Sequence, residues 1–273
     1  MSGFSDRNCF ALAVLLYGIS AAYSIVLLRR EVRQHQRLNY ILLLAAFGMH
    51  TTAMLMRGFT LDRCPINNLY EATMFVAWTM TAAYLVIGMW SKLRFLGAFA
   101  APVLFAIGVF ALLTPKDVGS PGHPEFSGGW LTLHVALFAL AYGAFGLSSV
   151  AGLMYLTQER DLKLHKMRAL FSLMPPIQRL ELVIRSLLIA GFILLTGGLI
   201  VSGVFMQQQG RPFTADFKIL WSLFVWAVYC ALIVLRWTAW RGGRRLAWGT
   251  IAAFTFVLLT FWGSSLMSPL HRL

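Results

Sequence analysis

Charged side chains are scarce in this sequence. Asp, Glu, Lys and Arg make up 12% of its 273 residues, whereas an average soluble domain is about a quarter charged. Hydrophobic residues account for 59%, and the mean hydropathy is +0.71. So little charge cannot cover a water-facing surface of this size, which excludes a water-soluble globular protein.

The sequence also lacks the usual signatures of soluble catalysis. It contains no GxSxG, HExxH, P-loop or dinucleotide-binding glycine motif. A carboxylate within a membrane span is the usual mark of a proton- or ion-coupled transporter, and the long apolar runs of this sequence contain none. The net charge of +13 comes without a soluble basic domain or a base-reading module, which argues against a nucleic acid partner. We therefore expect no enzymatic turnover.

Cysteine is rare and its spacing is uninformative. The three cysteines, Cys9, Cys64 and Cys230, form no CxxC pair, which argues against thiol chemistry and a structural zinc site. Cys9 and Cys64 are both expected near one membrane face, where a disulfide could join them. Unpaired thiols are the favoured interpretation.

What the chain does have is long apolar runs. Eight stretches are apolar enough, or nearly so, to cross a membrane, which takes about 20 residues, and none contains Asp, Glu, Lys or Arg. They predict an all-α, polytopic membrane helix bundle with about eight transmembrane helices, forming a single integral membrane domain over residues 1–273. The polar connection Leu156–Arg185 is expected to be partly helical. The predicted spans are about 10–28, 39–56, 72–90, 95–113, 130–155, 186–206, 219–235 and 247–267.

The basic residues predict the orientation of this bundle. The connections after spans 1, 3, 5 and 7 carry 4, 2, 6 and 4 Lys or Arg residues, together 16 of the 23 in the chain. Lys and Arg collect in cytoplasmic loops, so both termini are predicted outside. The first span is too long for a typical signal peptide and is followed directly by arginines, so we interpret it as a retained helix.

Two histidines are predicted near the outer membrane face. His134 lies about one helical turn into the fifth span, roughly 6 Å below the interface, and His271 lies about one turn beyond the eighth. Two facing imidazoles could coordinate a metal, and haem iron takes axial histidine. The alternative is that each is an ordinary interfacial histidine. His50 lies inside the second span, where it is either a functional residue or the partner in a helix–helix hydrogen bond.

Other local patterns have structural explanations. Asn68 and Glu71 resemble a capping box at the start of the third span, and Glu71 could also pair with Arg57 or Arg63. Small residues in the fifth and sixth spans predict close helix packing. They are Gly143, Gly146, Ser148, Ser149 and Gly152 in the fifth span and Gly191, Gly197, Gly198, Ser202 and Gly203 in the sixth.

Five motifs in order resemble a known family. The segment Pro65–Glu71 opens the third span, and Trp130 with His134 opens the fifth. A glycine-rich run, Gly191–Gly203, follows in the sixth span, and the chain closes with Gly263, Leu270 and His271. Between the glycine-rich run and these C-terminal residues lies a segment with Asp216, Lys218, Trp221, Ser222, Leu223 and Trp226. The pattern resembles the cytochrome c assembly transmembrane family, the CcsA/ResC/CcmC haem-handling proteins, and most closely their HemX/YpjD-like branch.

The resemblance implies that haem (heme) is held at the outer membrane face. It maps the two iron ligands onto His134 and His271, and His50 is a possible further ligand within the membrane. Where the family has tryptophans before the aspartate, this chain has Gln209, Phe213 and Ala215. The aromatic residues that could flank the ring are Trp130, Phe213 and Trp221. Asp216 belongs to the family motif, and Arg211 or Lys218 could meet a propionate.

The resemblance also implies a cellular setting. It places the chain in the cell inner (plasma) membrane as a multi-pass protein. Besides haem and membrane lipid, its partners would be other cytochrome c biogenesis membrane subunits or apocytochrome c. Two alternatives stay open. One is a scaffold or regulator of tetrapyrrole or cytochrome assembly that does not itself bind haem, docking through Leu156–Arg185. The other is a small-molecule transporter, which the missing intramembrane charges and the lack of an inverted repeat disfavour.

Overall fold

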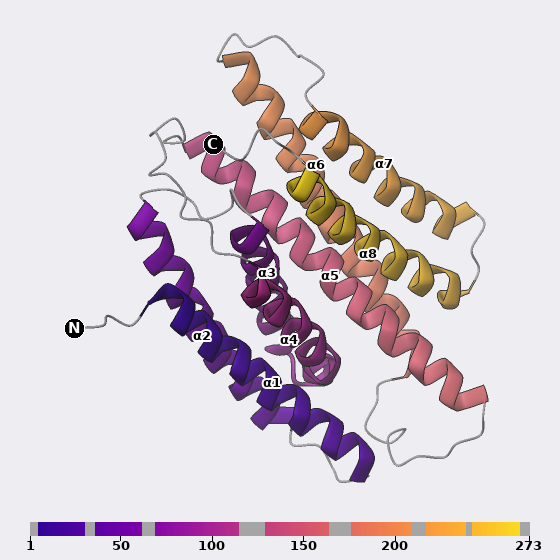
Figure 1. Cartoon of the computed structure of the whole chain (residues 1–273). Coiled ribbons are helices and arrows are strands. Elements are labelled where there is room, and N and C mark those ends of the chain that lie inside the picture. Colours follow the sequence, from indigo (N-terminus) through magenta and orange to yellow (C-terminus); the bar gives the residue numbers. More distant parts are fainter. Residues whose placement is uncertain are drawn as a thin grey trace.

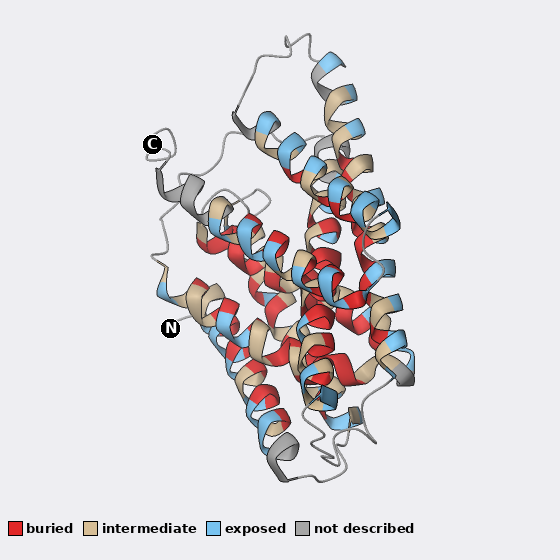
Figure 2. Ribbon diagram, turned by 90° about the vertical axis from the view of Figure 1, so that its right-hand side faces the viewer, coloured by how far each residue is buried: buried red, intermediate tan, exposed pale blue. Residues whose placement is uncertain are grey.

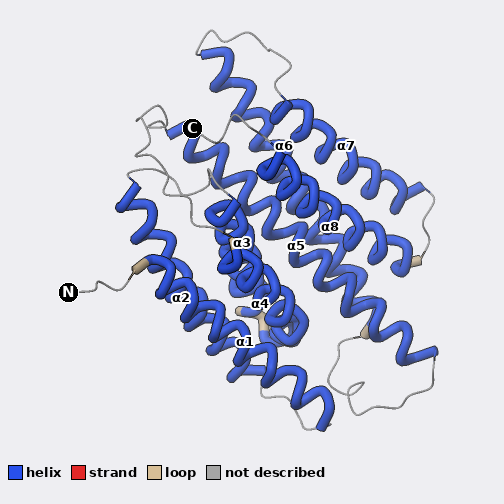
Figure 3. Tube along the Cα trace, viewed as in Figure 1, coloured by secondary structure: helices blue, strands red, loops and turns tan. Residues whose placement is uncertain are grey.

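The architecture is an all-helical bundle (Figure 3). The computed structural model describes residues 5–30, 36–61, 69–114, 129–163, 176–208, 217–238 and 242–267. Over these ranges every regular element is a helix. The elements are α1 (Asp6–Arg30), α2 (Gln36–Leu61), α3 (Leu69–Gly88), the 3-10 helix η1 (Ser91–Leu96), α4 (Gly97–Leu113), α5 (Gly129–Lys163), α6 (Ile177–Gln208), α7 (Phe217–Thr238) and α8 (Gly243–Met267).

Most of these helices can cross a membrane. Over the described residues, α1 to α7 are each long and apolar enough to do so. The side chains of α8 are described only to Thr260, and α8 is not one of these seven. Large apolar side chains such as Phe59, Ile193 and Ile200 are 62–82% exposed on the bundle surface. Such exposure suits contact with lipid tails, and the chain is a multi-pass membrane protein.

Helix α5 lies at the centre of the bundle (Figure 1). It packs against α3 and α4 on one side and against α6 and α8 on the other. Helices α1 and α2 flank the first group, and α7 flanks the second. Successive α-helices run in opposite directions, so α1 begins and α8 ends at the same end of the bundle (Figure 1). The starts of α3 and α5 lie at this end too, which decides where the candidate site forms.

Burial follows the same arrangement. Buried residues gather along the axis of the bundle, and exposed residues lie on its outward faces (Figure 2). Glycine allows the close approaches at the centre: a Cβ on Gly143 of α5 would lie 2.7 Å from the backbone oxygen of Thr79 on α3. Ser148 of α5 donates a hydrogen bond to the Ile184 carbonyl on α6 at 3.1 Å. The predicted close packing of α5 through small residues is therefore confirmed.

Two helices extend well beyond their predicted spans. Helix α5 continues to Lys163 and α6 begins at Ile177, so both ends of the polar connection are helical, as expected. An ion pair between Glu181 of α6 and Arg236 of α7 joins two helices at this end of the bundle. The extensions carry charge, which is why apolar length alone did not predict them.

Candidate functional site

A cavity opens between α3, α5 and α8, in the half of the bundle where α3 and α5 begin. Its volume is about 210 Å³ and its lining is almost entirely apolar. Among its described lining residues His134 supplies the one imidazole, and aromatic rings form much of the remaining wall. The lining residues are Ala72, Phe75, Val76 and Thr79 of α3, His134, Val135, Phe138, Ala139 and Tyr142 of α5, and Phe254, Val257 and Leu258 of α8.

The orientation of His134 is fixed by a backbone group on the neighbouring helix. Its Nδ1 lies 2.9 Å from the carbonyl oxygen of Gly198 on α6. A carbonyl only accepts, so Nδ1–H is the donor and the lone pair of the neutral ring resides on Nε2. Metal-binding histidines usually show this arrangement, in which the second nitrogen donates to a carbonyl or carboxylate. The imidazole therefore presents one nitrogen suited to bind a metal.

Glycine at position 198 makes this contact possible. A Cβ there would lie 2.5 Å from Cε2 of Phe138, which is far inside van der Waals contact. The same Phe138 ring stands 4.5 Å from the imidazole of His134, centroid to centroid. The predicted close packing is confirmed at Gly198. At Gly203 no described atom lies within 4 Å of a Cβ built there, so close packing at that position stays a prediction.

The structure describes only some of the other predicted site residues. Trp221 lies in α7, where its ring packs against Phe224 and against Phe256 of α8. It is not part of the cavity wall. Trp130 and Lys218 lie in the first turns of α5 and α7, but their side chains are not among those described. The remaining predicted residues lie outside the described part of the chain: Arg211, Phe213, Asp216 and His271.

His50 lies apart from this cavity. It is fully buried in α2 and faces α1, where Tyr17 Oη lies 3.1 Å from its Nδ1. The Tyr17 hydroxyl also lies 3.0 Å from Thr81 Oγ1 on α3, so one hydroxyl links three helices. The helix–helix hydrogen bond expected as one alternative is therefore present. Nε2 of His50 has no hydrogen-bond partner among the described residues.

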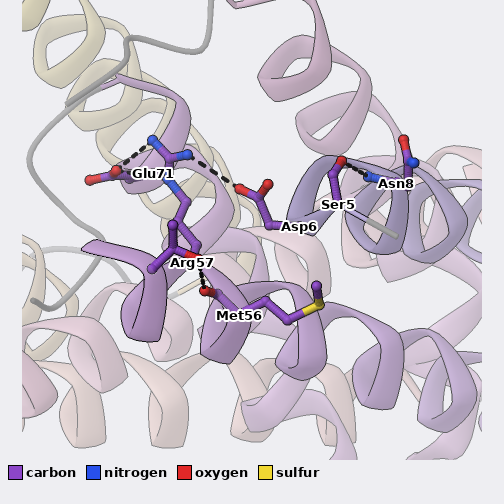
Figure 4. Close-up of polar contacts among 7 residues, drawn as sticks. Ser5, Asp6, Asn8, Met56, Arg57 and Glu71 are labelled. Atoms are coloured by element: carbon purple, nitrogen blue, oxygen red, sulfur yellow. Dashed lines mark hydrogen bonds and ion pairs between the residues drawn. The ribbon is translucent and has the colours of Figure 1, made fainter. Parts of the chain in front are cut away.

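A buried ion cluster joins the same three helices near the end where α1 begins (Figure 4). Arg57 of α2 is 3% exposed, and its Nε donates to Glu71 Oε1 of α3 at 2.8 Å. Its Nη1 donates to Asp6 Oδ2 of α1 at 3.2 Å. Of the two partners predicted for Glu71, the structure shows Arg57. The contribution of Asp6 was not predicted, because the sequence gives no sign that the first turn of α1 meets α2.

Cys9 contacts another sulfur. Its thiol is buried and free, and its Sγ lies 3.7 Å from Met56 Sδ of α2. Cys230 is also free. Cys64, the other half of the disulfide considered from the sequence, lies outside the described residues.

The aromatic wall of the cavity was not predicted. Phe138 follows His134 by one helical turn, and Phe75 and Thr79 are likewise spaced by one turn on α3, so each pair shares a helix face. Helical spacing could have grouped these residues within a helix. The sequence does not reveal that α3, α5 and α8 turn these faces toward one another.

Comparison with known proteins identifies one protein family. A sequence model of the family described as "Cytochrome C assembly protein" matches residues 66–271, which is most of the chain. The chain is 25% identical to a cytochrome c biogenesis protein CcsA of Gloeobacter violaceus, over 96% of this chain and 93% of that protein. It is 28% identical to the CcsA protein of a Prochlorococcus marinus strain, over 80% and 78%. A CcsA protein of Mesostigma viride is 26% identical, over 77% of each chain.

Proposed function

Since the chain belongs to the cytochrome c assembly protein family, we propose that it handles haem for cytochrome c biogenesis, holding it at the outer membrane face between two histidines. The observation that carries the proposal is the hydrogen bond from His134 Nδ1 to the Gly198 carbonyl. This bond leaves Nε2 as the nitrogen that can bind iron, and it holds the ring in place beside an apolar cavity.

The described residues fit an edge of a flat, apolar macrocycle. The wall offers the rings of Phe75, Phe138 and Phe254, and none of the described lining residues is charged. A volume of about 210 Å³ is below the ~300–1,000 Å³ of typical small-molecule sites. The cavity therefore accommodates part of the ring, and the rest has to be held by other segments at the same membrane face.

We assign the second iron ligand to His271, which lies inside the family match. Phe213 and Trp130 are assigned to the faces of the ring, and Arg211 and Lys218 to its propionates, where a charge-assisted bond would form. Asp216, between these basic residues in the sequence, is assigned to hold one of them. Haem supplies the redox-active iron when bound, and this chain's residues orient it and exclude water from one edge.

Location and partners follow from the same proposal. We place the chain in the inner (plasma) membrane, with its basic connections on the cytoplasmic side. Its partners would be other cytochrome c biogenesis membrane subunits and apocytochrome c, which would receive haem at the outer face.

The test is spectroscopic. The full-length protein is purified in detergent with and without added haem, and the Soret band is recorded for wild type, His134→Ala and His271→Ala. We expect a spectrum with two histidine ligands for wild type and loss of that spectrum in each variant. Added imidazole should restore it in His134→Ala, because the cavity wall is unchanged.

His165→Ala is the matched control, because His165 lies in the polar connection after α5 and is assigned no haem contact. This control should keep the wild-type spectrum. A His-ligated spectrum that survives both His134→Ala and His271→Ala would contradict the proposal.

A further inference from the structure

A second hollow lies at the opposite, basic end of the bundle. It is a groove of about 510 Å³ between the end of α3 with η1 and the first part of α6. One wall is made by Ile87, Trp90 and Leu93, and the other runs along α6 from Arg179 to Ala190. Helices α3 and α6 each pack on α5 but scarcely on each other, which leaves this space open on the bundle surface.

The groove crosses the predicted membrane boundary of α6. Arg179 and Ala190 are both lining residues on α6, and at 1.5 Å per residue they are about 16 Å apart along the helix. The sixth membrane span is predicted to begin at residue 186, after Arg179 and before Ala190. The groove therefore runs from the polar extension of α6 at Arg179 across the predicted membrane boundary near Ser186, and Ala190 lies about 6 Å inside the hydrocarbon.

The chemistry changes along this length. Below Arg179 the lining is apolar apart from the hydroxyl of Ser186. At the mouth, Arg179 makes no ion pair with any described carboxylate, because the nearby acidic residue of α6, Glu181, pairs with Arg236. Trp90, 61% exposed, stands on the facing wall, as aromatic residues do at membrane surfaces. An occupant that satisfies both ends of the groove has an anionic head and an apolar chain.

We propose that this groove binds an anionic phospholipid of the leaflet on the basic side. One acyl chain lies between α3 and α6, and the phosphate meets the Arg179 guanidinium. The head is anionic rather than zwitterionic because the connections at this end carry most of the chain's Lys and Arg, which favour net negative lipid. The groove shares no residue with the His134 cavity, so this proposal stands or fails independently of haem binding.

Trp90 provides the readout. The full-length protein is placed in phosphatidylcholine nanodiscs that contain increasing amounts of phospholipid brominated on its acyl chains, which quenches tryptophan on contact. The Trp90 signal is the difference between wild type and Trp90→Phe. We expect brominated phosphatidylglycerol to quench this signal at about a fivefold lower mole fraction than brominated phosphatidylcholine, the effect of one basic side chain near the surface.

Two arginine variants test whether Arg179 causes the preference for phosphatidylglycerol. Arg179→Gln should remove the preference for phosphatidylglycerol. Arg185→Gln, an exposed arginine of the same helix that does not line the groove, should keep it. Lipid that copurifies with each variant, measured by mass spectrometry, gives a second readout that does not need Trp90→Phe. Equal quenching by both headgroups, or a preference that Arg179→Gln leaves unchanged, would overturn the proposal.

Discussion

Substitution of Gly198 by alanine tests the link between helix packing and the imidazole of His134. The new Cβ would lie 2.5 Å from Phe138 Cε2. Carbon atoms in ordinary contact are about 3.5–4.0 Å apart, so α6 and the Phe138 ring must separate by about 1 Å. Either α6 moves away from α5, or Phe138 swings from its place beside His134.

Both responses damage the site. A shift of about 1 Å stretches the His134–Gly198 bond beyond hydrogen-bond range, which removes about 0.5–1.5 kcal/mol. Overpacking adds about 1–3 kcal/mol, and the better helix propensity of alanine returns about 1 kcal/mol. The net expectation is a free energy of unfolding lowered by about 1–3 kcal/mol. Haem affinity should fall about 10- to 100-fold, the usual effect of losing the group that orients a ligand.

The matched control is Gly203→Ala on the same helix. No described atom lies within 4 Å of a Cβ at this position, so only helix propensity changes, and the protein should be as stable as wild type or slightly more so. Stability is measured as thermal unfolding in detergent, and affinity by haem titration at the Soret band. If Gly198→Ala and Gly203→Ala behave alike in both assays, the packing argument is wrong.

Two further substitutions test the buried polar contacts of α1, α2 and α3 by the same unfolding assay. Arg57→Gln should lower the unfolding free energy by about 3–5 kcal/mol because it leaves buried carboxylates unpaired. The control Lys163→Gln, at the exposed pair with Glu159, should lower it by less than about 1 kcal/mol. Equal losses in the two variants would contradict the burial argument. Tyr17→Phe should cost about 0.5–2 kcal/mol because it deprives His50 and Thr81 of the shared hydroxyl. The control is Tyr23→Phe, at a half-buried tyrosine of the same helix, and a loss no greater than in this control would show that the Tyr17 hydroxyl contributes nothing.

The helical architecture could be predicted because it depends on local properties. Apolar runs without charge have to form helices in lipid, since each backbone polar group needs a partner within its own segment. Small residues at helical spacing predicted close packing, which is confirmed at Gly143 and Gly198 and stays a prediction at Gly203. The sequence shows that Gly143 and Gly198 are small, but not that Thr79 and Phe138 lie against them.

The contacts around the candidate site could be predicted only in part. His134 was predicted as a ligand, yet the group that orients it is a main-chain carbonyl 64 residues later, which no side-chain pattern marks. From the sequence, Glu71 could cap the third span or pair with Arg57 or Arg63. The choice of Arg57, and the addition of Asp6, depend on how three helices meet, and local periodicity does not encode this.

The arrangement of α3 explains how polar contacts far from the cavity bear on it. One face of α3 is held by α2, through Arg57–Glu71 and through Trp78 Nε1, which donates to Thr51 Oγ1 at 2.8 Å. Helices α1 and α2 contribute no described residue to the cavity wall, so their contacts with α3 bear on the cavity only through α3.

This arrangement separates two places where iron could bind. If His134 is the ligand, Tyr17→Phe loosens a support, so stability should fall while haem affinity changes little, since Tyr17 and His50 do not line the cavity. If His50 is the ligand, its hydrogen bond to Tyr17 helps to orient the ring, and the same substitution should weaken haem binding about 10- to 100-fold. A haem titration of Tyr17→Phe beside His134→Ala therefore decides between the intramembrane histidine and the cavity histidine.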